Sequence, residues 1–61
     1  MNLFWALIWA GVSGFHWMLA GLALAGGDRG WAVGEAILGS VGSALAIYYL
    51  ARAIREVSDG R

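Results

Sequence analysis

Apolar residues run through most of the chain in two long blocks, and polar residues gather between the blocks and at the C-terminal end. Residues 3–25 contain no formally charged side chain, and residues 31–51 contain only one, Glu35. At about 1.5 Å rise per residue, the first block would make a helix of roughly 34 Å, which is enough to cross the hydrocarbon core of a membrane. The pattern predicts a transmembrane helix at 3–25 and another at 31–51.

The segment between the two blocks, residues 26–30, carries the signals of a tight turn. It reads Gly-Gly-Asp-Arg-Gly, which combines helix-ending glycines with a helix-capping residue. Apolar segments in lipid must satisfy their own backbone groups, so both are expected to be helical, and so short a loop makes them antiparallel. The expected fold class is all-α: residues 1–61 form one membrane-embedded, antiparallel two-helix transmembrane hairpin with a polar tail at 52–61.

The composition favours lipid rather than water as the surroundings. Hydrophobic residues make up 61% of the 61 positions, and four arginines balance four acidic residues. A soluble domain of this size usually needs disulfides or a metal, but the chain has no cysteine and one histidine. Nucleic acid is not an expected partner, because the few arginines are scattered rather than clustered on one face.

The arginines and aromatic residues predict an orientation. One arginine, Arg29, lies in the loop and three lie in the tail, so the positive-inside rule places both termini in the cytoplasm, with the hairpin in the inner membrane of a bacterium. Aromatic residues near the ends of the helices are expected to form interfacial belts in contact with lipids. These residues are Trp5, Trp9, Trp31, Tyr48 and Tyr49.

Small residues recur at helical spacing in both blocks, which is typical of close helix packing in membranes. The two strips either pack against each other, or one of them receives a larger partner or another copy of the chain. The strip of the first helix comprises Ala6, Ala10, Gly14 and Gly21, and that of the second comprises Ala32, Ala36, Gly39, Gly42, Ser43, Ala46 and Ala53.

Two polar residues within the blocks are candidates for function. His16 lies near the middle of the first helix, where a polar side chain needs a partner or a role. It either makes a hydrogen bond to Ser13 or to a neighbouring subunit, or it ligates the metal of a haem or a (bacterio)chlorophyll. Glu35 either stabilises the positive N-terminal end of its helix or pairs with Arg29 or a partner. No set of residues typical of an enzyme is present, so the chain is expected to be non-catalytic.

Several short segments of the second block resemble the second span of small two-helix phage holins. They are Trp31-Ala32, Leu38-Gly39-Ser40, Tyr49-Leu50 and Ile54-Arg55-Glu56, and the similarity covers about half of the chain. The tail has fewer basic residues than holin tails usually have. The resemblance implies oligomers that permeabilise the cytoplasmic membrane.

Three functions follow as hypotheses. The leading one is a non-catalytic accessory subunit of a larger energy-transducing membrane complex, photosynthetic or respiratory, because the chain has two small-residue strips and almost no soluble mass. The alternatives are a holin-like oligomeric pore and a small subunit that binds a pigment or haem through His16. Partners are expected to be an integral membrane complex or further copies of the chain.

Overall fold

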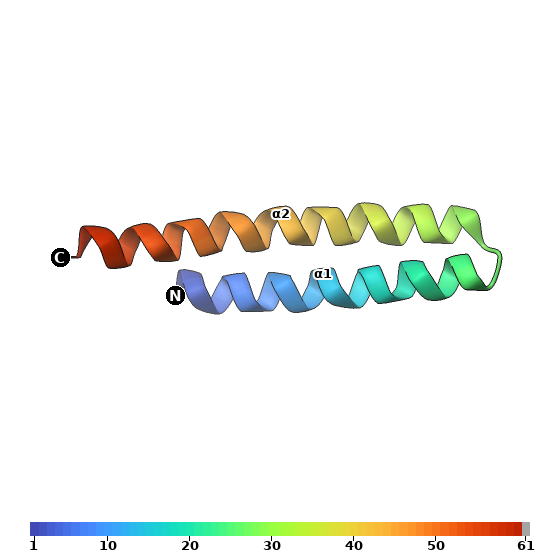
Figure 1. Ribbon diagram of the computed structural model, residues 1–61, viewed down its shortest axis with the longest axis horizontal. Helices are drawn as coiled ribbons and strands as arrows, with labels where there is room; N and C mark the ends of the chain where they lie inside the picture. The colour runs from blue at the N-terminus through green and yellow to red at the C-terminus, as the bar shows by residue number, and fades with distance from the viewer. Residues whose placement is uncertain (61) are drawn as a thin grey trace.

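Two antiparallel α-helices joined by a short loop make up the computed structural model, which describes residues 1–60 (Figure 1). Helix α1 spans Asn2–Ala25 and helix α2 spans Arg29–Asp59, and the pair measures 52 × 13 × 11 Å. By length and composition, each helix is long and apolar enough to cross a membrane. The expectation of an all-α fold with two long apolar helices is therefore confirmed.

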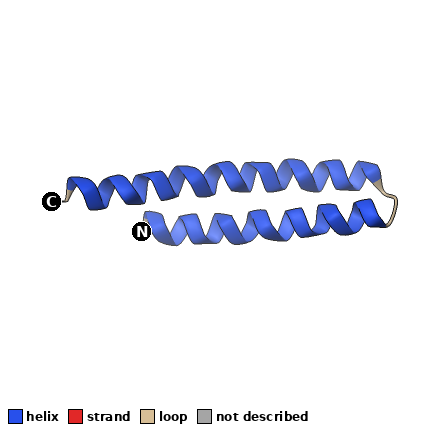
Figure 2. Ribbon diagram, in the orientation of Figure 1, coloured by secondary structure: helices blue, strands red, loops and turns tan. Residues whose placement is uncertain are grey.

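The loop consists of three residues, and its hydrogen bonds explain why it is so short (Figure 2). Gly27 has a φ of 85°, a left-handed conformation that glycine adopts without strain. The Gly27 amide donates to the Leu24 carbonyl and the Asp28 amide donates to the Ala23 carbonyl, which completes a Schellman motif at the end of α1. The next residue, Asp28, is already the N-cap of α2.

The Asp28 side chain stabilises the first turn of α2. Its Oδ1 accepts a hydrogen bond of 3.0 Å from the backbone amide of Trp31, one of the four amides that have no partner within the helix. We expect Asp28→Ala to lower the free energy of unfolding by about 1 kcal/mol. Far-UV circular dichroism during denaturation in mixed micelles measures this loss. Asp28→Ser keeps an oxygen acceptor and should retain most of the stability; equal losses in both variants would show that the cap contributes nothing.

Helix α2 begins before the apolar block at 31–51 and continues well past it, to Asp59. It begins early because Asp28 caps it, and it continues because residues 43–59 contain neither glycine nor proline. The C-terminal end of α2 projects past the start of α1 (Figure 1). The Asn2 side-chain amide donates to the Glu56 carboxylate and ties the open end of the hairpin together.

The residues that face the neighbouring helix recur at alternating spacings of three and four along each helix. This spacing averages 3.5 residues and is typical of helices that pack side by side along their whole length. On α1 the buried positions are Ala6, Ser13 and Ala20, with the half-buried Trp9, His16 and Ala23 between or beside them. On α2 the buried positions are Ala32, Glu35, Gly39 and Gly42.

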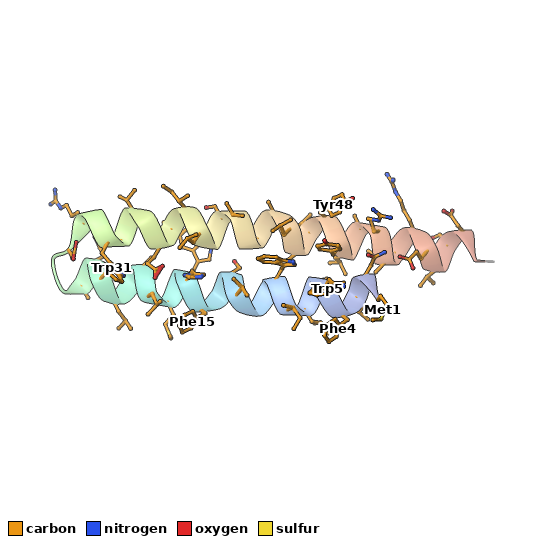
Figure 3. All side chains as sticks on the ribbon, turned by 180° about the vertical axis from the view of Figure 1, so that it is seen from behind. Met1, Phe4, Trp5, Phe15, Trp31 and Tyr48 are labelled. Atoms are coloured by element: carbon orange, nitrogen blue, oxygen red, sulfur yellow. The ribbon has the colours of Figure 1, made fainter. Side chains whose placement is uncertain are left out.

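The distribution of side chains is the reverse of that in a soluble protein. In the described part of the chain, the buried apolar residues are all alanines, whereas Ser13 and Glu35 are buried polar residues. Large apolar side chains lie outside: Leu7 is 66% exposed, Leu22 62% and Ile47 68%. Phe4 and Phe15 point away from α2 (Figure 3). Burial of apolar surface between the two helices is therefore small, and the outer surface is apolar.

Candidate functional site

The most distinctive feature of the contact between the helices is a pair of ionisable side chains, His16 and Glu35. The Nδ1 nitrogen of His16 lies 2.9 Å from the Oε1 oxygen of Glu35, which is hydrogen-bond distance. The Glu35 side chain is 9% exposed and the His16 side chain 24%. An enclosed carboxylate is stable only with a partner, so the pair satisfies a group that would otherwise be costly to bury.

A second polar cluster lies next to this pair, around Ser13. The Ser13 hydroxyl donates to the Gly39 carbonyl at 2.9 Å, and its oxygen lies 2.5 Å from the Ser43 hydroxyl oxygen. Because Ser13 has only one hydrogen to donate, the Ser43 hydroxyl is the donor in the second bond. Within residues 1–60, every enclosed side-chain nitrogen or oxygen has a hydrogen-bond partner.

Two glycines allow α1 and α2 to approach closely enough for these bonds. A Cβ atom at Gly42 would lie 3.1 Å from the backbone nitrogen, Cα and Cβ of Ser13, so the Ser13 backbone packs directly on Gly42. A Cβ atom at Gly39 would lie 2.8 Å from the indole nitrogen of Trp17. Both distances are shorter than ordinary carbon contacts, so a larger residue at either position requires its neighbour to move.

The small residues predicted on α2 lie at the contact with α1, whereas most of the strip predicted on α1 lies outside it. All seven predicted positions of α2 are buried or half-buried. On α1, Ala6 lies in the contact, whereas Ala10, Gly14 and Gly21 are exposed, and nothing lies within 4 Å of a Cβ built on either glycine. These three residues therefore do not pack against α2 within the hairpin, and the alternative that this strip receives a larger partner stays a prediction. The face defined by Ala6, Ser13 and Ala20 packs instead, because it carries the side chains that bond to α2.

The predicted aromatic belts lie toward the two ends of the hairpin. Trp31 lies near the loop, whereas Trp5 and Tyr48 lie toward the open end (Figure 3). Trp9 and Tyr49 are half-buried between the helices. The Arg52 guanidinium donates a 2.9 Å hydrogen bond to the Tyr48 hydroxyl and sits 5.7 Å from the centre of its ring. The role of these residues as interfacial belts stays a prediction.

The partners of His16 and Glu35 differ from those that sequence reasoning considered. Among the described residues, Ser13 bonds to α2 rather than to His16, and Glu35 pairs with His16 rather than with Arg29. The repeat of three and four residues through Ser13, His16 and Ala20 was the available signal, because it puts both polar side chains on one face. The pairing of His16 with Glu35 also depends on the register of the two helices, that is, on which positions of α1 and α2 lie opposite each other. The length and conformation of the loop determine this register.

A groove of about 520 Å³ lies beside the contact at the loop end of the hairpin. We call it the side groove. It is almost wholly apolar, with a single charged residue, Arg29, at its edge. Its lining comprises Trp17, Ala20, Gly21, Leu24, Arg29, Ala32, Val33 and Ala36. The side groove joins Gly21 of the α1 strip to Ala32 and Ala36 of the α2 strip on one surface.

The residues that could hold a cofactor are few. Within the described part of the chain, no group of three His, Cys, Asp or Glu side chains is placed to hold a metal ion. A tetrapyrrole metal needs only one axial ligand, and His16 could supply it only through Nε2, because Nδ1 is engaged with Glu35. A carboxylate on the other ring nitrogen is a common way to orient a ligating histidine.

Comparison with known proteins adds no family to this description. The chain matches no protein-family model, no curated protein and no solved structure. The resemblance to small phage holins thus stays a hypothesis based on the short segments of α2 named above.

Proposed function

We propose that the chain is a transmembrane hairpin that serves as a small non-catalytic accessory subunit of a larger membrane protein complex. The reversed distribution of side chains is the main support. Polar side chains that could not stay unpaired in lipid bond to each other between the helices, whereas the large apolar side chains cover the outside. In water, this outer surface would be exposed at a cost that three buried alanines do not offset.

The proposed orientation places both termini in the cytoplasm and the loop on the outer side of the inner membrane of a bacterium. Arg52 and Arg55 lie in the C-terminal part of α2, past its apolar block, where they could reach anionic lipid headgroups. The loop end of the hairpin carries one arginine, Arg29 at the start of α2, whose charge is offset by the neighbouring Asp28. This asymmetry follows the positive-inside rule.

A binding partner is part of the proposal because the outer surface contains features that lipid fills poorly. The side groove is apolar and open, and Gly14 and Gly21 leave room for another helix backbone. Close packing against small residues is the main source of helix association in membranes. The polar side chains face inward, which does not favour a holin-like pore, because a water path needs polar groups on an outer face. The photosynthetic or respiratory setting stays a prediction.

Gly21→Leu provides a test of the accessory role, because a Cβ atom at Gly21 meets nothing within 4 Å and the rest of the leucine side chain would occupy the side groove that a partner needs. The full chain is tagged, expressed in its native host and purified in mild detergent, and the bound proteins are quantified by mass spectrometry. We expect wild type to purify with an integral membrane protein in fixed ratio. Gly21→Leu should recover at least about tenfold less of it, equivalent to about 1.4 kcal/mol.

Gly34→Leu is the matched control. It also replaces a helical glycine that has nothing within 4 Å, but it lies outside the side groove, so the partner should be retained. The accessory role is wrong if wild type purifies alone, or if its expression collapses the membrane potential as a pore would. If both variants recover equally less of the partner protein, then the substitutions impair membrane insertion of the hairpin rather than docking of the partner in the side groove.

A further inference from the structure

One polar atom of the His16–Glu35 pair, the Nε2 nitrogen of His16, has no hydrogen-bond partner within residues 1–60. Among residues 1–60, the bond recorded for this ring is at Nδ1. Every enclosed side-chain nitrogen or oxygen in that range has a partner, so the unpaired Nε2 cannot be enclosed and must reach the outer surface. The 24% exposure of the side chain agrees with this. A polar atom thus faces outward from the middle of α1.

The charge of the pair decides whether Nε2 carries a hydrogen. A carboxylate beside a neutral imidazole has a net charge of minus one, which is costly in hydrocarbon. One shared proton removes that charge: either a protonated imidazole donates from Nδ1 to the carboxylate, or a carboxylic acid donates to Nδ1. In both arrangements Nε2 carries a hydrogen, because a neutral imidazole that accepts at Nδ1 is protonated at Nε2.

No other charged group in the described part of the chain is placed to compensate the carboxylate. Helix α1 has no formally charged residue from position 3 to its end at Ala25. On α2, the nearest ionisable residues are Arg29, roughly 9 Å from Glu35 along the axis toward the loop, and Tyr48, roughly 20 Å away in the other direction. The compensating proton must therefore belong to the pair itself.

We propose that His16 and Glu35 together hold one proton within the membrane and present Nε2–H as a hydrogen-bond donor to a carbonyl or carboxylate oxygen of the partner subunit. This inference rests on the proposed function, because the acceptor belongs to the partner. An N–H group facing hydrocarbon without an acceptor is unfavourable, so the donor both favours association and fixes the depth at which the partner docks. The pair thus provides a specific polar anchor on an apolar surface.

Nuclear magnetic resonance of the imidazole nitrogens tests the position of the proton. His16 is the single histidine of the chain, so labelling with ¹⁵N-histidine reports on this ring alone. In phosphatidylcholine nanodiscs at neutral pH, we expect the Nε2 signal of the isolated wild-type hairpin to be that of a protonated nitrogen. An unprotonated Nε2 would overturn the proposal, since the ring would then offer a lone pair suited to a metal.

Glu35→Gln and Ser40→Ala separate the role of the carboxylate from a general effect on α2. The glutamine amide is neutral and needs no compensating proton, so the Nε2 signal should move wholly or partly to the unprotonated range. Ser40 is exposed and bonds only to the Ala36 carbonyl of its own helix, so Ser40→Ala should leave the signal unchanged. An unchanged signal in Glu35→Gln would show that the carboxylate does not control the proton.

The acceptor is tested in the purified complex. Formation of a hydrogen bond should move the Nε2–H proton resonance downfield relative to the isolated hairpin. If the Nε2–H resonance is the same in the isolated hairpin and in the purified complex, then no oxygen of the partner accepts this hydrogen bond and that part of the proposal is wrong. A hairpin that purifies alone would overturn the proposed function and the acceptor together, whereas the measurement on the isolated hairpin would still decide where the proton lies.

Discussion

Gly42→Leu is expected to push the two helices apart and to lower the free energy of unfolding of the hairpin by about 1.5–3.5 kcal/mol, net of a gain of about 0.8 kcal/mol in helix propensity. A Cβ atom at this position would lie 3.1 Å from the Ser13 backbone, which cannot rotate away as a side chain could. Overpacking of this kind costs about 1–3 kcal/mol, and the separation would also break the bonds of Ser13 to Gly39 and Ser43, each worth about 0.6 kcal/mol in a membrane.

The separation can be measured directly because the chain contains no cysteine. Spin labels on cysteines introduced for Leu7 and Ile47, which are exposed on opposite helices, report the distance between α1 and α2. In Gly42→Leu we expect a longer and broader distance distribution than in wild type. Denaturation in mixed micelles supplies the accompanying change in free energy.

Gly34→Leu is again the appropriate control. Both substitutions replace a helical glycine of α2 with leucine and gain the same helix propensity, about 0.8 kcal/mol, but Gly34 has open space around it. Any difference between the two variants therefore reports on the contact with α1. If Gly42→Leu keeps the wild-type distance and stability, then the close approach at Gly42 does not hold the helices together.

The features predicted well are those that depend on neighbours in the sequence. Two apolar blocks were enough to predict two helices, and the glycines and charged residues of 26–30 were enough to predict a helix end followed by a helix start. The small residues predicted on α2, including Gly39 and Gly42, lie at the contact with α1 because they recur at three- and four-residue spacing on one face. The end of α2 extends further than its apolar block because helix formation depends on propensity and caps as well as on hydrophobicity.

The features that sequence reasoning missed depend on the fit between the helices. Helix α1 carries two series of small residues, one through Ala6, Ser13 and Ala20 and the other through Ala10, Gly14 and Gly21, and size alone does not distinguish them. The polar side chains decide between the two series, since Ser13 and His16 find partners on α2 only when the first series faces it. Residue size alone therefore does not predict which of the two series packs against α2.

The His16–Glu35 pair leads to the second large expected effect, an unequal outcome for single and double substitutions. His16→Leu or Glu35→Leu alone should destabilise the hairpin by about 2–4 kcal/mol, because each leaves a polar group without its partner in an apolar contact. The double substitution removes both polar groups and fills similar volume, so it should be more stable than either single variant. Equilibrium unfolding of all four chains in bicelles measures this coupling.

The outcome of this double-mutant cycle also indicates what the His16–Glu35 pair contributes to the protein. If the double variant folds as stably as wild type but no longer retains the partner, then the pair is not needed to form the hairpin, and its role lies in the donor that His16 presents outward. If the losses of stability in the two single variants simply add in the double variant, then His16 and Glu35 act independently, and the proposal that they share a proton is wrong. Leucine at both positions thus separates stability from recognition, because it keeps the apolar packing and removes only the polar anchor.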